Sequence, residues 1–116
     1  MKEKNFKLII SFNGKDFYGW QKQKDKKTVQ GTIEEIAKEI FKSDVKVYGC
    51  GRTDSKVNGI NYVANFKIKT NLNSLNIKNA LNSRLPSSIY IKDVKEVDLN
   101  FHSRYDAKRK SYRYII

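Results

Sequence analysis

The sequence contains very little cysteine, histidine or proline: Cys50, His102 and Pro86 are each the only residue of their kind among 116 residues. A single cysteine excludes an intramolecular disulfide and a cysteine-based zinc site, and it fits a reducing compartment. A single histidine excludes a histidine-rich metal site. We therefore expect a cytoplasmic protein in which none of these residue types builds a metal centre.

Long apolar segments are also missing. No run approaches the roughly 18 residues that a membrane-spanning helix needs, and the charged N-terminus leads directly into a strand-like segment without the pattern of a signal peptide. Hydrophobic residues still make up 39% of the chain. That content is enough for the core of one compact domain, and the chain is too short for two. We expect no membrane association.

Acidic residues are scarce compared with basic ones. The chain has 12 Asp and Glu against 24 Lys and Arg, which gives a formal net charge of +12. A charge of this size repels itself and favours a polyanionic partner such as nucleic acid. The alternative is a compositional bias of an A/T-rich genome, because 19 of the 24 cations are lysines and asparagine and isoleucine are also abundant.

Hydrophobic periodicity predicts four strands and two helices. Alternation predicts the strands at residues 6–12, 45–48, 60–69 and 89–97, and it places Ile60 on the same face as Tyr62. Three- and four-residue spacing predicts a helix that Thr28 caps and that runs to Phe41, and a second helix over 71–85. Ser74 is the expected cap of the second helix, and Pro86 ends it.

The order strand, helix, strand, strand, helix, strand predicts an α+β fold of the ferredoxin-like β-α-β-β-α-β type. Its antiparallel sheet carries both helices on one face and leaves the other face free. We expect residues 1–100 to form this domain. Residues 101–116 then form a linker and the first strand of a truncated C-terminal half, because the chain ends inside a strand-like segment that has no partner strand.

The glycine-rich loop over residues 49–59 is the first candidate site. Arg52 and Asp54 lie one residue apart in it, so both side chains can face the same way. An arginine beside an aspartate favours the ionised carboxylate, which can act as a nucleophile, a general base or an electrostatic stabiliser. The alternative is structural: an aspartate that forms a turn, with an arginine in a weak surface ion pair.

Two further segments combine aromatic and basic residues. In the loop over residues 15–27, Phe17, Tyr18 and Trp20 can stack on bases while Lys22 and Lys24 contact phosphates, or Phe17 and Trp20 can cover the edge of the core.

The segment 101–114 concentrates arginine in a chain that otherwise uses lysine, and arginine suits bidentate recognition of phosphate. Its candidate RNA-binding residues are Arg104, Arg109 and Arg113, with Tyr112 as a ring that can stack on an unpaired base. The alternative is a basic edge strand with ordinary aromatic packing. We expect His102 to be a hydrogen-bonded structural residue.

Seven motifs in the same order make the chain resemble the N-terminal half of the TruA-type tRNA pseudouridine synthases over almost its whole length. They include Tyr18-Gly19-Trp20-Gln21-Lys22-Gln23, Thr28-Val29-Gln30, Gly51-Arg52-Thr53-Asp54, Val63-Ala64-Asn65-Phe66, Leu81-Asn82-Ser83-Arg84-Leu85-Pro86, Phe101-His102-Ser103-Arg104-Tyr105 and Arg109-Lys110-Ser111-Tyr112-Arg113-Tyr114. The resemblance implies isomerisation of uridine to pseudouridine in the anticodon stem-loop of tRNA.

The resemblance also implies site residues and partners. Asp54 matches the catalytic aspartate, which acts as the nucleophile on the base or the ribose or supports cleavage to a glycal-like species. Arg52 matches the arginine that pairs with the aspartate and helps to hold the target nucleotide out of the stack, and Tyr112 matches the aromatic residue that packs against the uracil. The resemblance further implies that the reaction uses no metal or organic cofactor and that the full-length protein is a homodimer.

The chain departs from the family pattern at two positions after Asp54, where Lys56 stands in place of glycine and Asn58 in place of histidine. It is also about half as long as family members, so we expect it to be inactive by itself. The alternatives are a non-catalytic basic RNA-binding module and a dimerisation half. An RRM domain carries its aromatic RNP1 pattern on the third strand. This chain has Asn61, Val63 and Asn65 there, which argues against an RRM domain.

Overall fold

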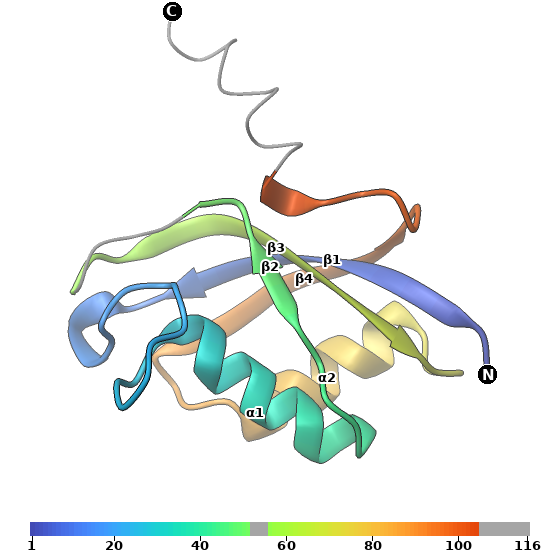
Figure 1. The fold of residues 1–116 in the computed structure, drawn as a ribbon, viewed down its shortest axis with the longest axis horizontal. Helices are drawn as coiled ribbons and strands as arrows, with labels where there is room; N and C mark the ends of the chain where they lie inside the picture. Colours follow the sequence, from blue (N-terminus) through green and yellow to red (C-terminus); the bar gives the residue numbers. More distant parts are fainter. Residues whose placement is uncertain (52–55, 105–116) are drawn as a thin grey trace, which may run out of the picture.

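The computed structural model describes residues 1–51 and 56–104. Within them the chain forms one four-stranded sheet in the order β2-β3-β1-β4, and all three strand pairs are antiparallel (Figure 1). Both helices lie on one face of this sheet. The elements are β1 (Glu3–Phe12), the 3₁₀ turn η1 (Gly14–Asp16), α1 (Val29–Phe41), β2 (Val47–Gly49), β3 (Gly59–Lys69), α2 (Ser74–Arg84) and β4 (Ile89–Val97). This arrangement confirms the predicted ferredoxin-like α+β fold.

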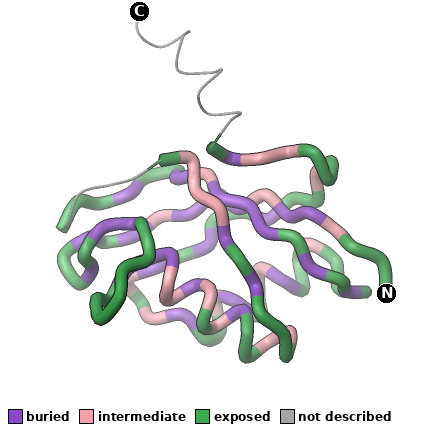
Figure 2. Tube along the Cα trace, viewed as in Figure 1, coloured by how far each residue is buried: buried purple, intermediate pink, exposed green. Residues whose placement is uncertain are grey.

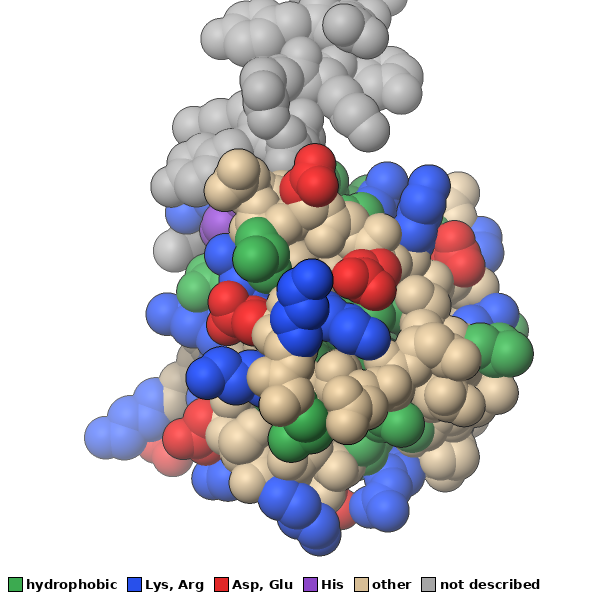
Figure 3. Space-filling model, turned by 90° about the vertical axis from the view of Figure 1, so that its right-hand side faces the viewer, with side chains coloured by type: hydrophobic (Ala, Val, Ile, Leu, Met, Phe, Trp, Pro, Cys, Tyr) green, Lys and Arg blue, Asp and Glu red, His purple; other side chains and the backbone are tan. Residues whose placement is uncertain are grey.

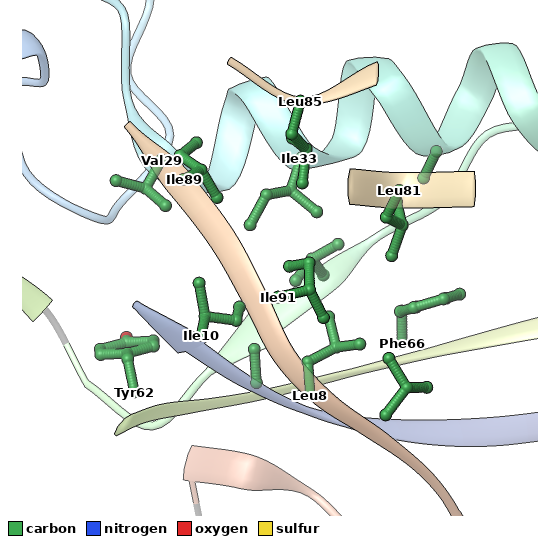
Figure 4. Packing of buried hydrophobic residues seen from close by; sticks show 14 of the residues in the cluster. Leu8, Ile10, Val29, Ile33, Tyr62, Phe66, Leu81, Leu85, Ile89 and Ile91 are labelled. Carbon is green, nitrogen blue, oxygen red and sulfur yellow. The ribbon is translucent and has the colours of Figure 1, made fainter. Parts of the chain in front are cut away.

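The core lies between the sheet and the two helices, where alternate residues of each strand meet the apolar stripe of each helix (Figures 2 and 4). All of its main contributors are almost completely buried. They are Phe6, Leu8 and Ile10 from β1, Ala64 and Phe66 from β3, Ile91 from β4, Val29, Ile33 and Ala37 from α1, and Ile77 and Leu81 from α2. The alternation and the helical spacing in the sequence predicted these faces correctly.

Element ends show two corrections. α2 begins at Ser74, but its cap is Asn73, whose side-chain oxygen accepts a hydrogen bond from the Asn76 N–H at 2.8 Å. The prediction that Ser74 caps α2 was wrong by one residue, because Asn73 is the last residue with extended backbone and its amide oxygen reaches the first turn. β2 covers Val47–Gly49 rather than 45–48. Thr28 caps α1 as predicted, accepting from the Gly31 N–H at 3.2 Å.

The start of β3 interrupts the predicted alternation. Ile60 is 79% exposed instead of facing the core with Tyr62. Asn61 has a φ of 53°, and the pairing of β1 with β3 shifts by one residue, so that Phe12 lies opposite Gly59. A Cβ on Gly59 would overlap the Phe12 ring. This bulge turns Ile60 outward, and the prediction for Ile60 was therefore wrong.

The helix-free face of the sheet is partly covered, which corrects the prediction that it stays free. Residues 98–104 cross it after β4 (Figure 1), and three buried polar side chains hold them there. Asn5 donates to the backbone oxygens of Asp98 and Phe101 at 2.8 and 3.0 Å. The Asn65 side-chain oxygen accepts from both the N–H and the hydroxyl of Ser103, at 2.8 and 2.7 Å. The Asn65 amide also donates to the Asn5 side-chain oxygen at 3.1 Å.

We expect the substitution Asn65→Ala to lower the free energy of unfolding by about 2–3 kcal/mol, because it leaves two donors of Ser103 and one acceptor of Asn5 buried without a partner. Urea denaturation followed by the fluorescence of Trp20, the only tryptophan, measures the change. Asn79→Ala is the matched control, because Asn79 is exposed on α2. Equal stability of the two variants would contradict a structural role for this network.

No helix in the described part of the chain is both long enough and apolar enough to cross a lipid bilayer.

Candidate active site

The loop that carries the predicted catalytic residues begins at the end of β2, where the backbone lies directly against an aromatic cluster. A Cβ on Gly49 would overlap both the indole of Trp20 and the hydroxyl of Tyr62, so only glycine fits at this position. The ring centroids of Trp20 and Tyr62 are 4.4 Å apart, and Phe12 completes the cluster at 5.7 Å from Tyr62. The next residue, Cys50, donates its N–H to the Val63 carbonyl at 2.9 Å.

Tyr62 fixes Gly51, which opens the predicted catalytic motif and is the last described residue before Arg52. Its hydroxyl accepts a hydrogen bond from the Gly51 N–H at 3.1 Å and donates one to the Gly51 carbonyl. Burial raises the pKa of Tyr62 well above its ordinary range, and this effect exceeds the lowering by the Gly51 backbone hydrogen bond. The hydroxyl is protonated at neutral pH and can donate to the Gly51 carbonyl, and its raised pKa extends this to alkaline pH.

The return side of the loop is held by the segment that follows β1. Lys56 donates its N–H to the Phe17 carbonyl at 3.1 Å, and the Asn58 side-chain oxygen accepts from the Gly14 N–H at 2.7 Å. A Cβ on Gly14 would overlap the backbone of Val57, so the two segments lie in close contact. Both stems of the loop are thus anchored to neighbouring elements. Arg52 and Asp54, which lie between the stems, are outside the described residues.

The two positions that depart from the family pattern have clear structural roles. Lys56 has a φ of 69°, the left-handed conformation that glycine adopts most easily, so the lysine keeps this turn at some cost in strain. Asn58 supports the loop through its hydrogen bond to Gly14. Sequence reasoning did not identify Tyr62 or Asn58 as supports of the loop. A polar hydroxyl at an inward-facing strand position was the available signal for Tyr62.

The aromatic residues of the loop between β1 and α1 divide into buried and exposed ones. Phe17 and Trp20 are 0% and 1% exposed, so they cover the edge of the core and are not available to stack on bases. Of the two alternatives for these residues, the structure favours packing. Tyr18 is 42% exposed, and it is the ring in this segment that remains accessible.

The structure places the predicted RNA-binding cations in different surroundings. Lys22 lies along α1, with its ammonium 3.4 Å from a Glu34 oxygen that is largely buried, and Lys24 is exposed in the same loop. Arg104 is exposed on the opposite, helix-free side of the sheet, where its N–H donates to the imidazole of His102 at 3.2 Å. The structure therefore does not bring Lys22 and Arg104 together. Arg109, Tyr112 and Arg113 lie outside the described residues.

The imidazole of His102 also lies against the ring of Tyr48, with centroids 4.7 Å apart. These contacts agree with the expected structural role of His102.

A groove of about 990 Å³ runs beside the first turns of α1. Gln30 builds one wall, because it accepts from the Lys22 N–H at 2.6 Å and donates to the Val47 carbonyl at 2.7 Å. The charged side chains that line the groove are mixed in sign: Lys22, Lys26, Lys27, Lys38, Lys46, Glu34, Glu35 and Asp44. Across residues 1–51 and 56–104, no group of three or more His, Cys, Asp or Glu side chains is placed to hold a metal ion.

Comparison with known proteins gives a consistent result. A model of the tRNA pseudouridine synthase family matches residues 8–106. The chain is 47% identical over 113 residues to a protein of Caldicellulosiruptor saccharolyticus, and 48% identical over 114 residues to one of Dictyoglomus thermophilum. Both are named tRNA pseudouridine synthase A. Each match covers 97% of this chain and 46% of the relative, so the chain spans about half the length of these curated relatives.

The matched range contains the whole described sheet from Leu8 onward, both helices and the anchored loop that carries Gly51-Arg52-Thr53-Asp54. The chain therefore belongs to the tRNA pseudouridine synthase family, and it corresponds to about half of a typical relative.

Proposed function

We propose that this chain is the N-terminal half of an enzyme that isomerises uridine to pseudouridine in the anticodon stem-loop of tRNA. The observation that carries the proposal is the doubly anchored loop. Tyr62 holds the backbone of Gly51 on one side of the Arg52-Thr53-Asp54 motif, and Phe17 and Gly14 hold Lys56 and Asn58 on the other side. A catalytic group on a loop with fixed stems can be positioned for reaction.

The reaction itself limits what the protein must supply. The bond between ribose C1′ and uracil N1 breaks, the base turns, and a bond forms between C1′ and C5. C5 loses its hydrogen, and N1 gains a proton. Atoms and electrons balance without an oxidant or a reductant, so the proposed mechanism needs no redox cofactor. We assign Asp54 as the nucleophile, Arg52 as its partner that keeps the carboxylate ionised, and Tyr112 as the ring against the uracil.

RNA binding is assigned to the basic residues of the two surface segments, Lys22, Lys24, Arg104, Arg109 and Arg113. Because Lys22 and Arg104 lie on opposite sides of the sheet, an RNA that contacts both has to wrap around the edge of the domain that carries the loop. We propose that the complete protein is a cytoplasmic homodimer, and that its second half supplies the remaining wall of the cleft over the target nucleotide.

We expect the 116-residue chain alone to form no pseudouridine, because half of the cleft is then absent. Release of tritium from tRNA labelled at uridine C5 measures the reaction directly, since C5 loses its hydrogen. The comparison protein is the chain extended along its reading frame beyond Ile116 to the length of its relatives. A comparable rate for the short chain would contradict the need for a second half. An extended protein that releases no tritium from any tRNA would contradict the proposed function.

A further inference from the structure

Two lysines from separate segments lie at the ring of Tyr18. The ammonium groups of Lys26 and Lys56 lie 4.9 and 4.5 Å from the ring centroid. Lys27 follows Lys26 in the sequence, and its ammonium lies 5.3 Å from the centroid of the Phe17 ring. Lys26 and Lys56 are 30 residues apart in the sequence, so the fold, and not local sequence, brings these charges together.

Backbone hydrogen bonds build this arrangement. The Tyr18 N–H donates to the Lys27 carbonyl at 2.8 Å, and the Gln23 side-chain amide donates to the Tyr18 carbonyl at 3.0 Å. The loop therefore folds back on itself and returns Lys26 to Tyr18. The bond from the Lys56 N–H to the Phe17 carbonyl brings in the second lysine. The site is thus formed before any ligand binds.

Two free-energy costs act against this arrangement when no ligand is bound. Lys56 holds a left-handed backbone conformation that costs a non-glycine residue about 1 kcal/mol, and the two ammonium groups repel each other. Each cation–π contact at an exposed ring contributes only about 0.5–1 kcal/mol. An anion that binds both ammonium groups would remove the repulsion, so the site favours a negatively charged ligand.

The charges of these two lysines are not neutralised within the described part of the chain. Neither Lys26 nor Lys56 forms an ion pair there, whereas Lys22 in the same loop is paired with Glu34. Figure 3 shows the opposite end of the molecule, where basic and acidic side chains are interspersed. Two ammonium groups at one ring distinguish this site, within the described part of the chain, from Lys7 at Phe101 and Lys46 at Tyr48, where a single ammonium lies at the ring.

We propose that Tyr18, Lys26 and Lys56 form a binding site for one phosphate of the RNA backbone beside the reactive nucleotide. This proposal rests on the proposed function, because Lys56 lies two residues after Asp54 in the sequence. Two ammonium groups offer up to six N–H donors to phosphate oxygens. The ring is already in contact with cations, so it serves to hold the lysines, and the ligand is a phosphate and not a stacked base.

The test is the salt dependence of tRNA binding by the 116-residue chain and its variants. For the double variant Lys26→Gln and Lys56→Gln, we expect the slope of log Kd against log salt to fall by about 1, and Kd to rise about 5- to 10-fold at low salt. Lys26→Arg with Lys56→Arg keeps both charges and should keep the slope of the parent. Fluorescence of Trp20 verifies that each variant is folded.

Lys67→Gln with Lys69→Gln is the matched control, because it also removes two exposed charges, near the other end of β3. Ten steps of about 3.3 Å each place Lys69 roughly 33 Å from Gly59 at the start of that strand. If the glutamine variant of Lys26 and Lys56 behaves like this control, or if the parent shows no salt dependence, the phosphate site is wrong. Tritium release by the extended protein is measured separately, so failure of the site and failure of the proposed function can be distinguished.

Discussion

Asp54→Asn in the extended protein is expected to reduce pseudouridine formation about 10⁴-fold or more while leaving tRNA binding intact. The amide has nearly the same shape as the carboxylate but carries no negative charge. Whether the aspartate attacks the base, attacks C1′ or stabilises a glycal-like species, each route requires an ionised carboxylate. The prediction therefore holds for all three routes. Tritium release measures kcat, and filter binding measures the affinity for tRNA.

Asp16→Asn is the matched control for this experiment. Asp16 is an exposed aspartate in the neighbouring turn η1, and its substitution changes the net charge by the same amount. We expect its effect on kcat to stay below about threefold, because surface substitutions away from special features are nearly neutral. Equal activity of Asp54→Asn and the parent protein would exclude Asp54 as the nucleophile. Loss of tRNA binding together with activity would instead indicate a role in the structure of the loop.

Most of the fold could be predicted because each element buries one face. On β1 the buried Phe6, Leu8 and Ile10 alternate with half-buried residues, which reflects a sheet with helices on one side only. The spacing of Val29 and Ile33 reflects a helix on that sheet. Such periodicities arise from local geometry and are visible in a single sequence.

The errors occur where contacts distant in the sequence decide the conformation. Ile60 faces solvent because Gly59 has to lie against the ring of Phe12, 47 residues earlier in the chain, and the bulge that results reverses the alternation. Asn5 and Asn65 have the pattern of solvent-facing strand residues. They are buried because they satisfy each other and Ser103, and no sequence pattern shows that such partners exist.

The sequence motif of the candidate site was predicted, but the residues that hold its loop in place, Tyr62 and Asn58, were not. From spacing alone, the structural interpretation of Arg52 and Asp54, a turn with a surface ion pair, was favoured over the catalytic one, and only the resemblance to a family gave Asp54 a catalytic role. Tyr62 was predicted as a core residue of its strand, which is correct for its ring. Its hydroxyl holds Gly51, a contact that requires knowledge of where the end of β2 lies.

Trp20→Ala is expected to lower the free energy of unfolding by about 3–5 kcal/mol. Trp20 is 1% exposed, and its ring lies against both Tyr62 and Phe12. Gly49 approaches the indole so closely that a Cβ would overlap it, so the ring also forms the surface on which the end of β2 lies. A loss of this size is a large part of the roughly 5–15 kcal/mol that stabilises a typical domain.

Urea denaturation followed by far-UV circular dichroism is the appropriate measurement, because the variant contains no tryptophan for fluorescence. Trp20→Phe keeps an aromatic ring and should cost less than the alanine variant, because part of the apolar volume remains. Tyr18→Ala is the matched control in the same loop, and since Tyr18 is 42% exposed we expect a loss below about 1 kcal/mol. If Trp20→Ala were no less stable than Tyr18→Ala, the indole would not support the loop. In the extended protein, we expect the Trp20→Phe variant to lose part of its activity. Tyr62 can hold Gly51 only while its own ring is packed against residue 20.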